Sequence, residues 1–135
     1  MTTTEEMLSM ARDAMDKAYA PYSRFRVGAV VKSVNGKLFA GCNVENASYP
    51  VGSCAEQSAI SAMVMGGETK IAEIMVMGSG DALVSPCGAC RQRIREFATP
   101  ETLVLICDRN GVRKTVKLTE LLPYSFGPEN LSVGE

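Results

Sequence analysis

The chain has 135 residues, a formal net charge of −1 at pH 7, no histidine and a composition ordinary for a globular protein. This length predicts a single domain over residues 1–135. The slightly acidic balance argues against a nucleic-acid partner, and the lack of a recognisable secretory leader or long apolar run argues against a membrane partner.

The first half of the chain is expected to form a helix, a hairpin and a second helix. Apolar residues at helical spacing predict the first helix, and Thr3 with Glu6 fits a capping box at its start. Asn35-Gly36 is a strong hairpin signal between two runs of strand length. The expected elements are a helix over residues 4–18, strands over 25–34 and 37–43, and a helix over 53–65.

The second half alternates strands with helices. Its expected elements are a strand over 71–78, a helix over 88–97, strands over 103–108 and 112–117, and a short helical turn over 118–122. Together these segments predict an α/β fold, a three-layer α/β/α arrangement around a five-stranded mixed sheet. Loops that run into helix N-termini are the places where such folds build their sites.

Cysteines open two of these helices. Cys54 comes two residues before Glu56, and Cys87 and Cys90 share the first turn of the later helix. Five cysteines are an odd number for a disulfide scaffold, so we expect a cytoplasmic protein with free thiols. Three thiolates at helix N-termini, with one position left open, are typical of a catalytic zinc site. Glu56 would lie beside the water on that metal.

Blander interpretations of these cysteines stay open at this point. Residues 53–56 also fit a capping box in which Ser53 and Glu56 serve only the helix end. The Cys-Gly-Ala-Cys segment could be a redox pair, or half of a structural zinc site completed by Cys42 or Cys107. The joint pattern is stronger, because a ligand, one residue, a glutamate and a later Pro-Cys-x-x-Cys form the signature of zinc deaminases.

Three thiolates around Zn²⁺ leave a net charge of −1, which should make water on the metal less acidic than in a neutral-ligand site. A nearby cation would offset this excess. Arg91 follows Cys90 directly and is the expected cation, acting near the thiolates without binding the metal.

Over residues 19–126 the sequence resembles the cytidine deaminase family in its small, homotetrameric, three-cysteine form. The resemblance rests on APYSRFRVGA at 20–29, GCNVENA at 41–47, CAE at 54–56, PCGACRQ at 86–92 and LLPYSF at 121–126. It implies the cytidine deaminase fold, one Zn²⁺ per subunit and a homotetramer whose sites are shared between subunits. The implied reaction converts cytidine and deoxycytidine to uridine and deoxyuridine plus ammonia, in pyrimidine salvage.

The resemblance also implies a role for each matching residue. Glu56 would take a proton from the zinc-bound water, deliver it to N3 of cytosine and later protonate the leaving ammonia. Gln57 departs from the pattern, since many members carry arginine there to offset thiolate charge. The implied zinc ligands are Cys54, Cys87 and Cys90, and the implied nucleoside contacts are Phe25, Asn43, Glu45, Ala55, Ser85 and Phe126.

Without the resemblance, Asn43 and Glu45 would be taken for a polar strand end, and Phe25 and Phe126 for core aromatics. Three rival functions also remain. They are the same chemistry on an aminopyrimidine such as a blasticidin-type antibiotic, deamination of a nucleic acid, and a non-enzymatic zinc module with four cysteine ligands.

Overall fold

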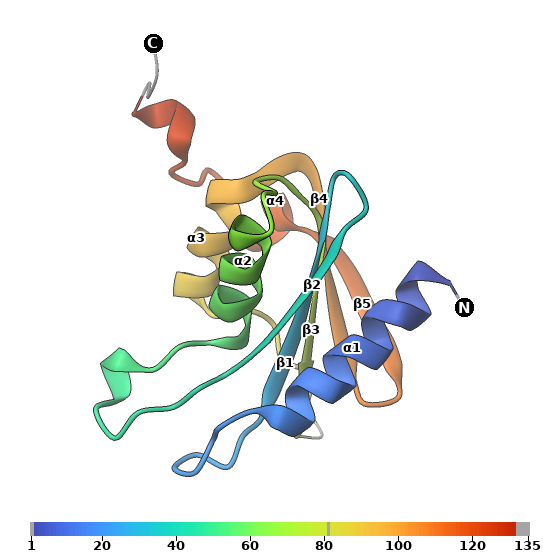
Figure 1. Cartoon of the computed structure of the whole chain (residues 1–135). Coiled ribbons are helices and arrows are strands. Elements are labelled where there is room, and N and C mark those ends of the chain that lie inside the picture. The colour runs from blue at the N-terminus through green and yellow to red at the C-terminus, as the bar shows by residue number, and fades with distance from the viewer. Residues whose placement is uncertain (1, 81, 132–135) are drawn as a thin grey trace.

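Five strands form one mixed sheet in the computed structural model, which describes residues 2–80 and 82–131 (Figure 1). The strands lie in the order β2-β1-β3-β4-β5; β3 and β4 run parallel, and every other neighbouring pair runs antiparallel. The predicted five-stranded mixed sheet is confirmed. The strands are β1 (Val27–Ser33), β2 (Leu38–Cys42), β3 (Ile71–Gly78), β4 (Ala98–Asp108) and β5 (Gly111–Lys117).

Helices cover both faces of this sheet, which confirms the three-layer α/β/α arrangement. Helix α1 crosses one face, and α2 and α3 lie side by side on the other (Figure 1). Each layer boundary is apolar, so burial of side chains on both faces holds the layers together. The helices are α1 (Thr3–Lys17), α2 (Ala55–Met65), α3 (Gly88–Phe97) and α4 (Leu118–Leu121), with short 3-10 turns at Tyr49–Val51 and Pro128–Asn130.

Strand β1 shows how alternation assigns side chains to the two layers. Ala29 and Val31 pack in the cluster beneath α2 and α3, whereas Val30 packs in the cluster beneath α1. The predicted hairpin follows β1, and Gly36 adopts a positive φ of 86° in its turn. Most predicted boundaries lie within two residues of the observed ones; β4 is the exception, since it begins at Ala98 rather than at 103.

The predicted cap of α1 is wrong by one residue. The hydroxyl of Thr2 accepts a hydrogen bond from the Glu5 N–H at 3.1 Å, and the Glu5 carboxylate accepts one from the Thr2 N–H at 3.0 Å. The pairs Thr2/Glu5 and Thr3/Glu6 both satisfy the sequence rule, and the chain enters the helix at the earlier pair. Among residues 2–80 and 82–131, no helix is both long enough and apolar enough to cross a bilayer.

Candidate active site

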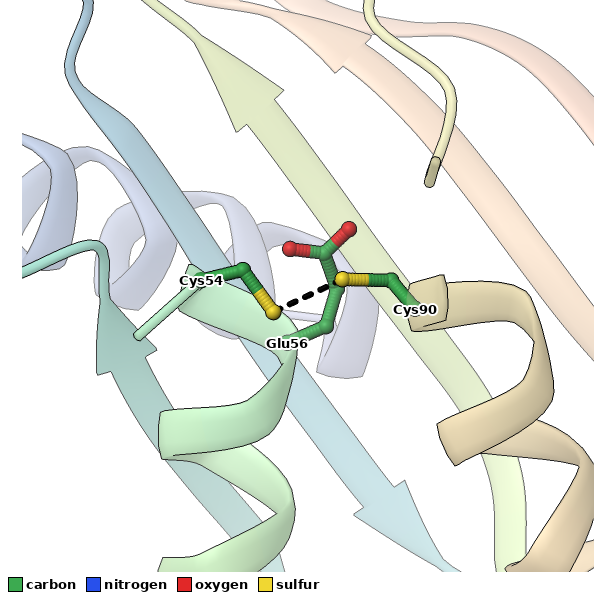
Figure 2. A group of neighbouring side chains, drawn as sticks. All are labelled: Cys54, Glu56 and Cys90. Atoms are coloured by element: carbon green, nitrogen blue, oxygen red, sulfur yellow. Dashed lines mark hydrogen bonds between the residues drawn. The ribbon is translucent and has the colours of Figure 1, made fainter. Parts of the chain in front are cut away.

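The N-cap residue of α2 is Cys54 rather than Ser53. The Cys54 thiol accepts a hydrogen bond from the Gln57 N–H at 3.4 Å and so caps the helix, while the backbone of Ser53 pairs with Val44. The capping box proposed for Ser53 and Glu56 is therefore wrong. Glu56 is therefore not needed to cap the helix. Its side chain points into the space between the N-termini of α2 and α3 (Figure 2).

Three metal-capable side chains meet at the N-termini of α2 and α3. Atoms of Cys54, Glu56 and Cys90 all lie within 4.8 Å of one another, and Figure 2 shows the two sulfurs facing each other beside the carboxylate. The sulfurs are 2.7 Å apart. Thiolates at helix N-termini are a donor set that suits zinc.

A close contact between the two sulfurs shifts the pKa values of Cys54 and Cys90 in opposite directions. A hydrogen bond from Cys90 is the main cause that lowers the pKa of Cys54 to about 6, with help from the Gln57 N–H and the charge of Arg93. The same contact, followed by burial, raises the pKa of Cys90 well above its ordinary value. Burial raises the pKa of Glu56 to about 7, and the neighbouring Cys54 thiolate adds to this rise. A carboxyl group that titrates near neutral pH is suited to carry protons.

Cys87 interacts with the Cys90 thiol at the edge of this group, whereas Cys42 and Cys107 are not part of it. Cys87 is the N-cap residue of α3, three residues before Cys90, and its exposed thiol lies outside the three-residue cluster. Cys107 packs beneath α1 on the opposite face of the sheet. In the described part of the chain, the metal-capable cluster includes neither Cys107 nor Cys42. A four-cysteine structural site that uses either residue has no support.

Arg93, and not Arg91, is the cation beside the thiols. Nη1 of Arg93 lies 3.9 Å from the sulfurs of both Cys54 and Cys90. All three hydrogen bonds that the Arg91 side chain makes in the structure go to other groups: the Pro86 and Leu121 carbonyls and the Ser85 hydroxyl. Arg91 contacts the loop that precedes Cys87, and its contribution to the site stays a prediction. Arg93 was missed, although its spacing of three from Cys90 is a helical signal.

A pocket of about 390 Å³ adjoins the cluster, which is within the range of small-molecule sites. Cys54, Ala55 and Glu56 line one part of it, and Asn43 and Glu45 line another. Residues from two separate sequence motifs therefore share one cavity. Its wall also contains residues that the sequence did not single out, among them Tyr22, Ser23 and Tyr49.

Asn43 and Glu45 also hold the backbone around the pocket. Asn43 accepts a hydrogen bond from the Val27 N–H and donates one to the Phe25 carbonyl, each at 2.9 Å. Glu45 accepts hydrogen bonds from the N–H groups of Tyr22 and Ser23 and from the Ser23 hydroxyl. Asn43 and Glu45 are therefore more than a polar end of a strand, because their side chains hold the loop that precedes β1.

Three of the expected nucleoside contacts, Phe25, Ser85 and Phe126, are not among the residues that line this pocket. Phe25 is half-buried and packs against Gly78 and Gly80. Ser85 is exposed and hydrogen-bonded to Arg91. Phe126 is 58% exposed, and its carbonyl accepts a hydrogen bond from Gln92, so it is not a core aromatic. Among the expected nucleoside contacts, only Ala55 lines the cavity together with Asn43 and Glu45.

Thiols and a buried carboxylate at facing helix N-termini fit the metal site of a zinc hydrolase of the deaminase class. Comparison with known proteins supports the same class. The family model for the cytidine and deoxycytidylate deaminase zinc-binding region matches residues 1–106. The cytidine deaminase of Sporosarcina psychrophila is 36% identical over 128 residues, which are 95% of this chain and 94% of that protein.

A relative and a solved structure extend this likeness. The cytidine deaminase of Mycobacterium tuberculosis strain H37Rv is 41% identical over 122 residues, covering 90% of this chain and 87% of that protein. The crystal structure of cytidine deaminase from Burkholderia pseudomallei superposes with a TM-score of 0.84 at 40% identity, covering 93% of this chain and all of that one. This chain belongs to the cytidine and deoxycytidylate deaminase family of zinc-binding proteins.

Proposed function

We propose that this chain hydrolyses cytidine and deoxycytidine to uridine and deoxyuridine, releasing ammonia, and that it serves pyrimidine salvage in the cytoplasm. Family membership gives the reaction class, zinc-dependent hydrolytic deamination of cytidine. The observation that carries the proposal is the pocket whose wall contains both the thiol–carboxylate cluster and the Asn43–Glu45 pair. In such a cavity Asn43 and Glu45 can bind the sugar while Cys54 and Glu56 lie close enough to act on the base.

Cys54, Cys87 and Cys90 are assigned as the ligands of one zinc ion per subunit. Two of them already face each other, and the third opens the helix that carries Cys90. The bound metal supplies a Lewis acid that lowers the pKa of water toward neutrality. The N-termini of α2 and α3 place partial positive charge next to the thiolates and so help to keep them ionised.

Glu56 is assigned as the carrier of protons. The chain contains no histidine, and Glu56 is the carboxylate of the metal-capable cluster found among the described residues. Its carboxylate takes a proton from the attacking water and gives it to N3 of the cytosine ring. Glu56 then takes a second proton, from the hydroxyl group that water has formed on C4, and gives it to the amine as the C4–N bond breaks, which leaves the C4 carbonyl and ammonia. Its burial beside the two thiols places this carboxylate next to the reacting groups.

The substrate contacts follow the pocket wall. We assign the sugar hydroxyls to Asn43 and Glu45, whose oxygens keep spare acceptor capacity beyond their loop contacts. The backbone at Ala55 is assigned to the base. Phe25 and Ser85 are kept as further contacts on the strength of the resemblance.

Assembly as a homotetramer with shared sites is part of the proposal. Phe126 is exposed and lies outside its own chain's pocket, as an aromatic that reaches a neighbouring subunit would. Met65 is 90% exposed at the end of α2, so the isolated subunit leaves apolar surface uncovered. Light scattering of the purified protein tests this: a tetramer is expected, and a monomer that is fully active would contradict shared sites.

The function is tested by following ultraviolet absorbance with cytidine, deoxycytidine, cytosine, adenosine and a blasticidin-type nucleoside. Loss of cytidine and deoxycytidine absorbance with release of ammonia is expected, and the free base cytosine should react poorly because it lacks the sugar. Activity confined to the antibiotic would replace the substrate assignment. No reaction with any compound by protein that holds one zinc per subunit would favour the non-enzymatic module.

A further inference from the structure

Arg93 makes the same contact with two cysteines from different helices. Its Nη1 atom lies 3.9 Å from the Cys54 sulfur and 3.9 Å from the Cys90 sulfur. Cys90 and Arg93 are three residues apart on α3 and so share a face of that helix, whereas Cys54 belongs to the start of α2. One guanidinium group therefore spans the seam between the two helices that form the site.

The site needs such a charge. Three thiolates around Zn²⁺ carry one negative charge in excess. Gln57 occupies the position next to Glu56 where the resemblance leads one to expect arginine, and its main-chain N–H donates to the Cys54 sulfur at 3.4 Å. An amide side chain adds no net charge there. The side chains of Gln57 and Arg93 line the same surface hollow between α2 and α3.

The neighbouring arginines, Arg91 and Arg95, bind groups other than the cysteine sulfurs. Arg91 holds the Pro86 and Leu121 carbonyls, and Arg95 pairs with Glu129 and donates to the Ser125 hydroxyl at 2.7 Å. Among the described residues, Arg93 is the arginine or lysine whose side chain hydrogen bonds to a cysteine sulfur. Hydrogen bonds from a cation are stronger than those from a neutral donor, and they leave the sulfur ionised.

We propose that Arg93 is a positioning residue that supplies, from α3, the positive charge that Gln57 does not supply from α2. The inference rests on the zinc assignment made above. Arg93 offsets the excess charge of the thiolates, holds Cys54 and Cys90 together across the helix seam, and so keeps the metal bound. The position of the compensating cation has moved between helices, while the charge balance of the site is kept.

The test compares zinc retention in four variants. Arg93→Gln removes the positive charge, and Arg93→Lys keeps it on a single ammonium group in place of the guanidinium. The double variant Arg93→Gln/Gln57→Arg moves the charge to α2. Arg95→Gln is the matched control, because it removes one positive charge from the same helix at a distance from the thiols. The readouts are the rate of zinc transfer to a chromogenic chelator and, separately, kcat and KM for cytidine.

Arg93→Gln should lose zinc about 10- to 100-fold faster than wild type and lower kcat more than it raises KM. Arg93→Lys should lie between the two and the double variant should regain most of the retention, while Arg95→Gln should retain zinc as wild type does. Retention unchanged in Arg93→Gln, or a loss that Gln57→Arg does not reverse, would overturn the proposal. Wild-type protein that binds no zinc would instead overturn the proposed function, so the two failures are distinguishable.

Discussion

The Arg91 side chain donates a hydrogen bond from Nε to the carbonyl oxygen of Pro86 at 2.8 Å. This contact ties the first turn of α3 to the loop that leads into Cys87. The same guanidinium donates from Nη1 to the Leu121 carbonyl, also at 2.8 Å, and so links that loop to α4. Arg91 acts through geometry, because its fixed fork of donors joins two separate carbonyl groups.

Arg91→Lys should therefore be less stable than wild type and lose zinc faster, even though it keeps the positive charge. A lysine cannot reproduce both contacts, so the Pro86 or Leu121 carbonyl loses its partner at a cost of about 1–3 kcal/mol in the free energy of unfolding. We expect a lower urea midpoint and faster zinc loss in Arg91→Lys and Arg91→Ala alike, measured by urea denaturation and by chelator competition. If Arg91→Lys behaved like wild type, Arg91 would stabilise the protein through its charge rather than through its two carbonyl contacts.

Glu45 anchors the loop before β1 and should make stability depend on pH. Its pKa is lowered from the ordinary value of 4.5, first by the Ser23 hydroxyl and then by the Ser23 N–H. A lowered folded-state pKa stabilises the fold above the unfolded value, and this stabilisation disappears as pH falls through the folded one. The urea midpoint of wild type should therefore exceed that of Glu45→Gln at neutral pH, and the difference should shrink in acid. A difference independent of pH would contradict this role for the carboxylate.

Gly41 permits the close approach of β2 to α2. A Cβ atom at this position would lie 2.7 Å from the Ser58 carbonyl carbon and would also meet the Ala59 N atom. Gly41→Ala should displace the helix that carries Cys54 and Glu56 and should cost about 1–3 kcal/mol in the free energy of unfolding. Gly88→Ala is the control, since nothing lies within 4 Å of its added methyl group. Equal stability of the two variants would show that α2 moves without cost.

The sequence was sufficient to predict the layers of the fold and the place of the site. Apolar residues that recur every two residues in strands, or every 3.6 residues in helices, indicate which faces are buried. Asn35-Gly36 predicts a tight hairpin turn that few other dipeptides form. The neighbourhood of Cys54 and Cys90 was also predictable, because both cysteines open helices. Nothing in one-dimensional spacing could place Tyr22 or Tyr49 in the pocket wall, since loops bring them there.

One error and one omission have a shared cause, which is a choice between residues close together in the sequence. Thr2 and Thr3 both precede a glutamate by three positions, so the sequence rule fits both, and the structure has Thr2 as the cap. Arg91 and Arg93 both follow Cys90 closely, yet one step along a helix turns a side chain away whereas three steps return it to the same face. Adjacency in sequence favoured Arg91, and helix geometry selects Arg93 for the thiols.

The most direct test of Glu56 as the proton carrier at a zinc site is cytidine turnover by Glu56→Gln with its zinc content measured in the same sample. The amide keeps the shape of the side chain but cannot accept and return a proton. We predict one zinc per subunit in both proteins and a fall in kcat of at least about 10²- to 10⁴-fold in the variant. A Glu56→Gln protein that held zinc and deaminated cytidine at the wild-type rate would contradict this assignment.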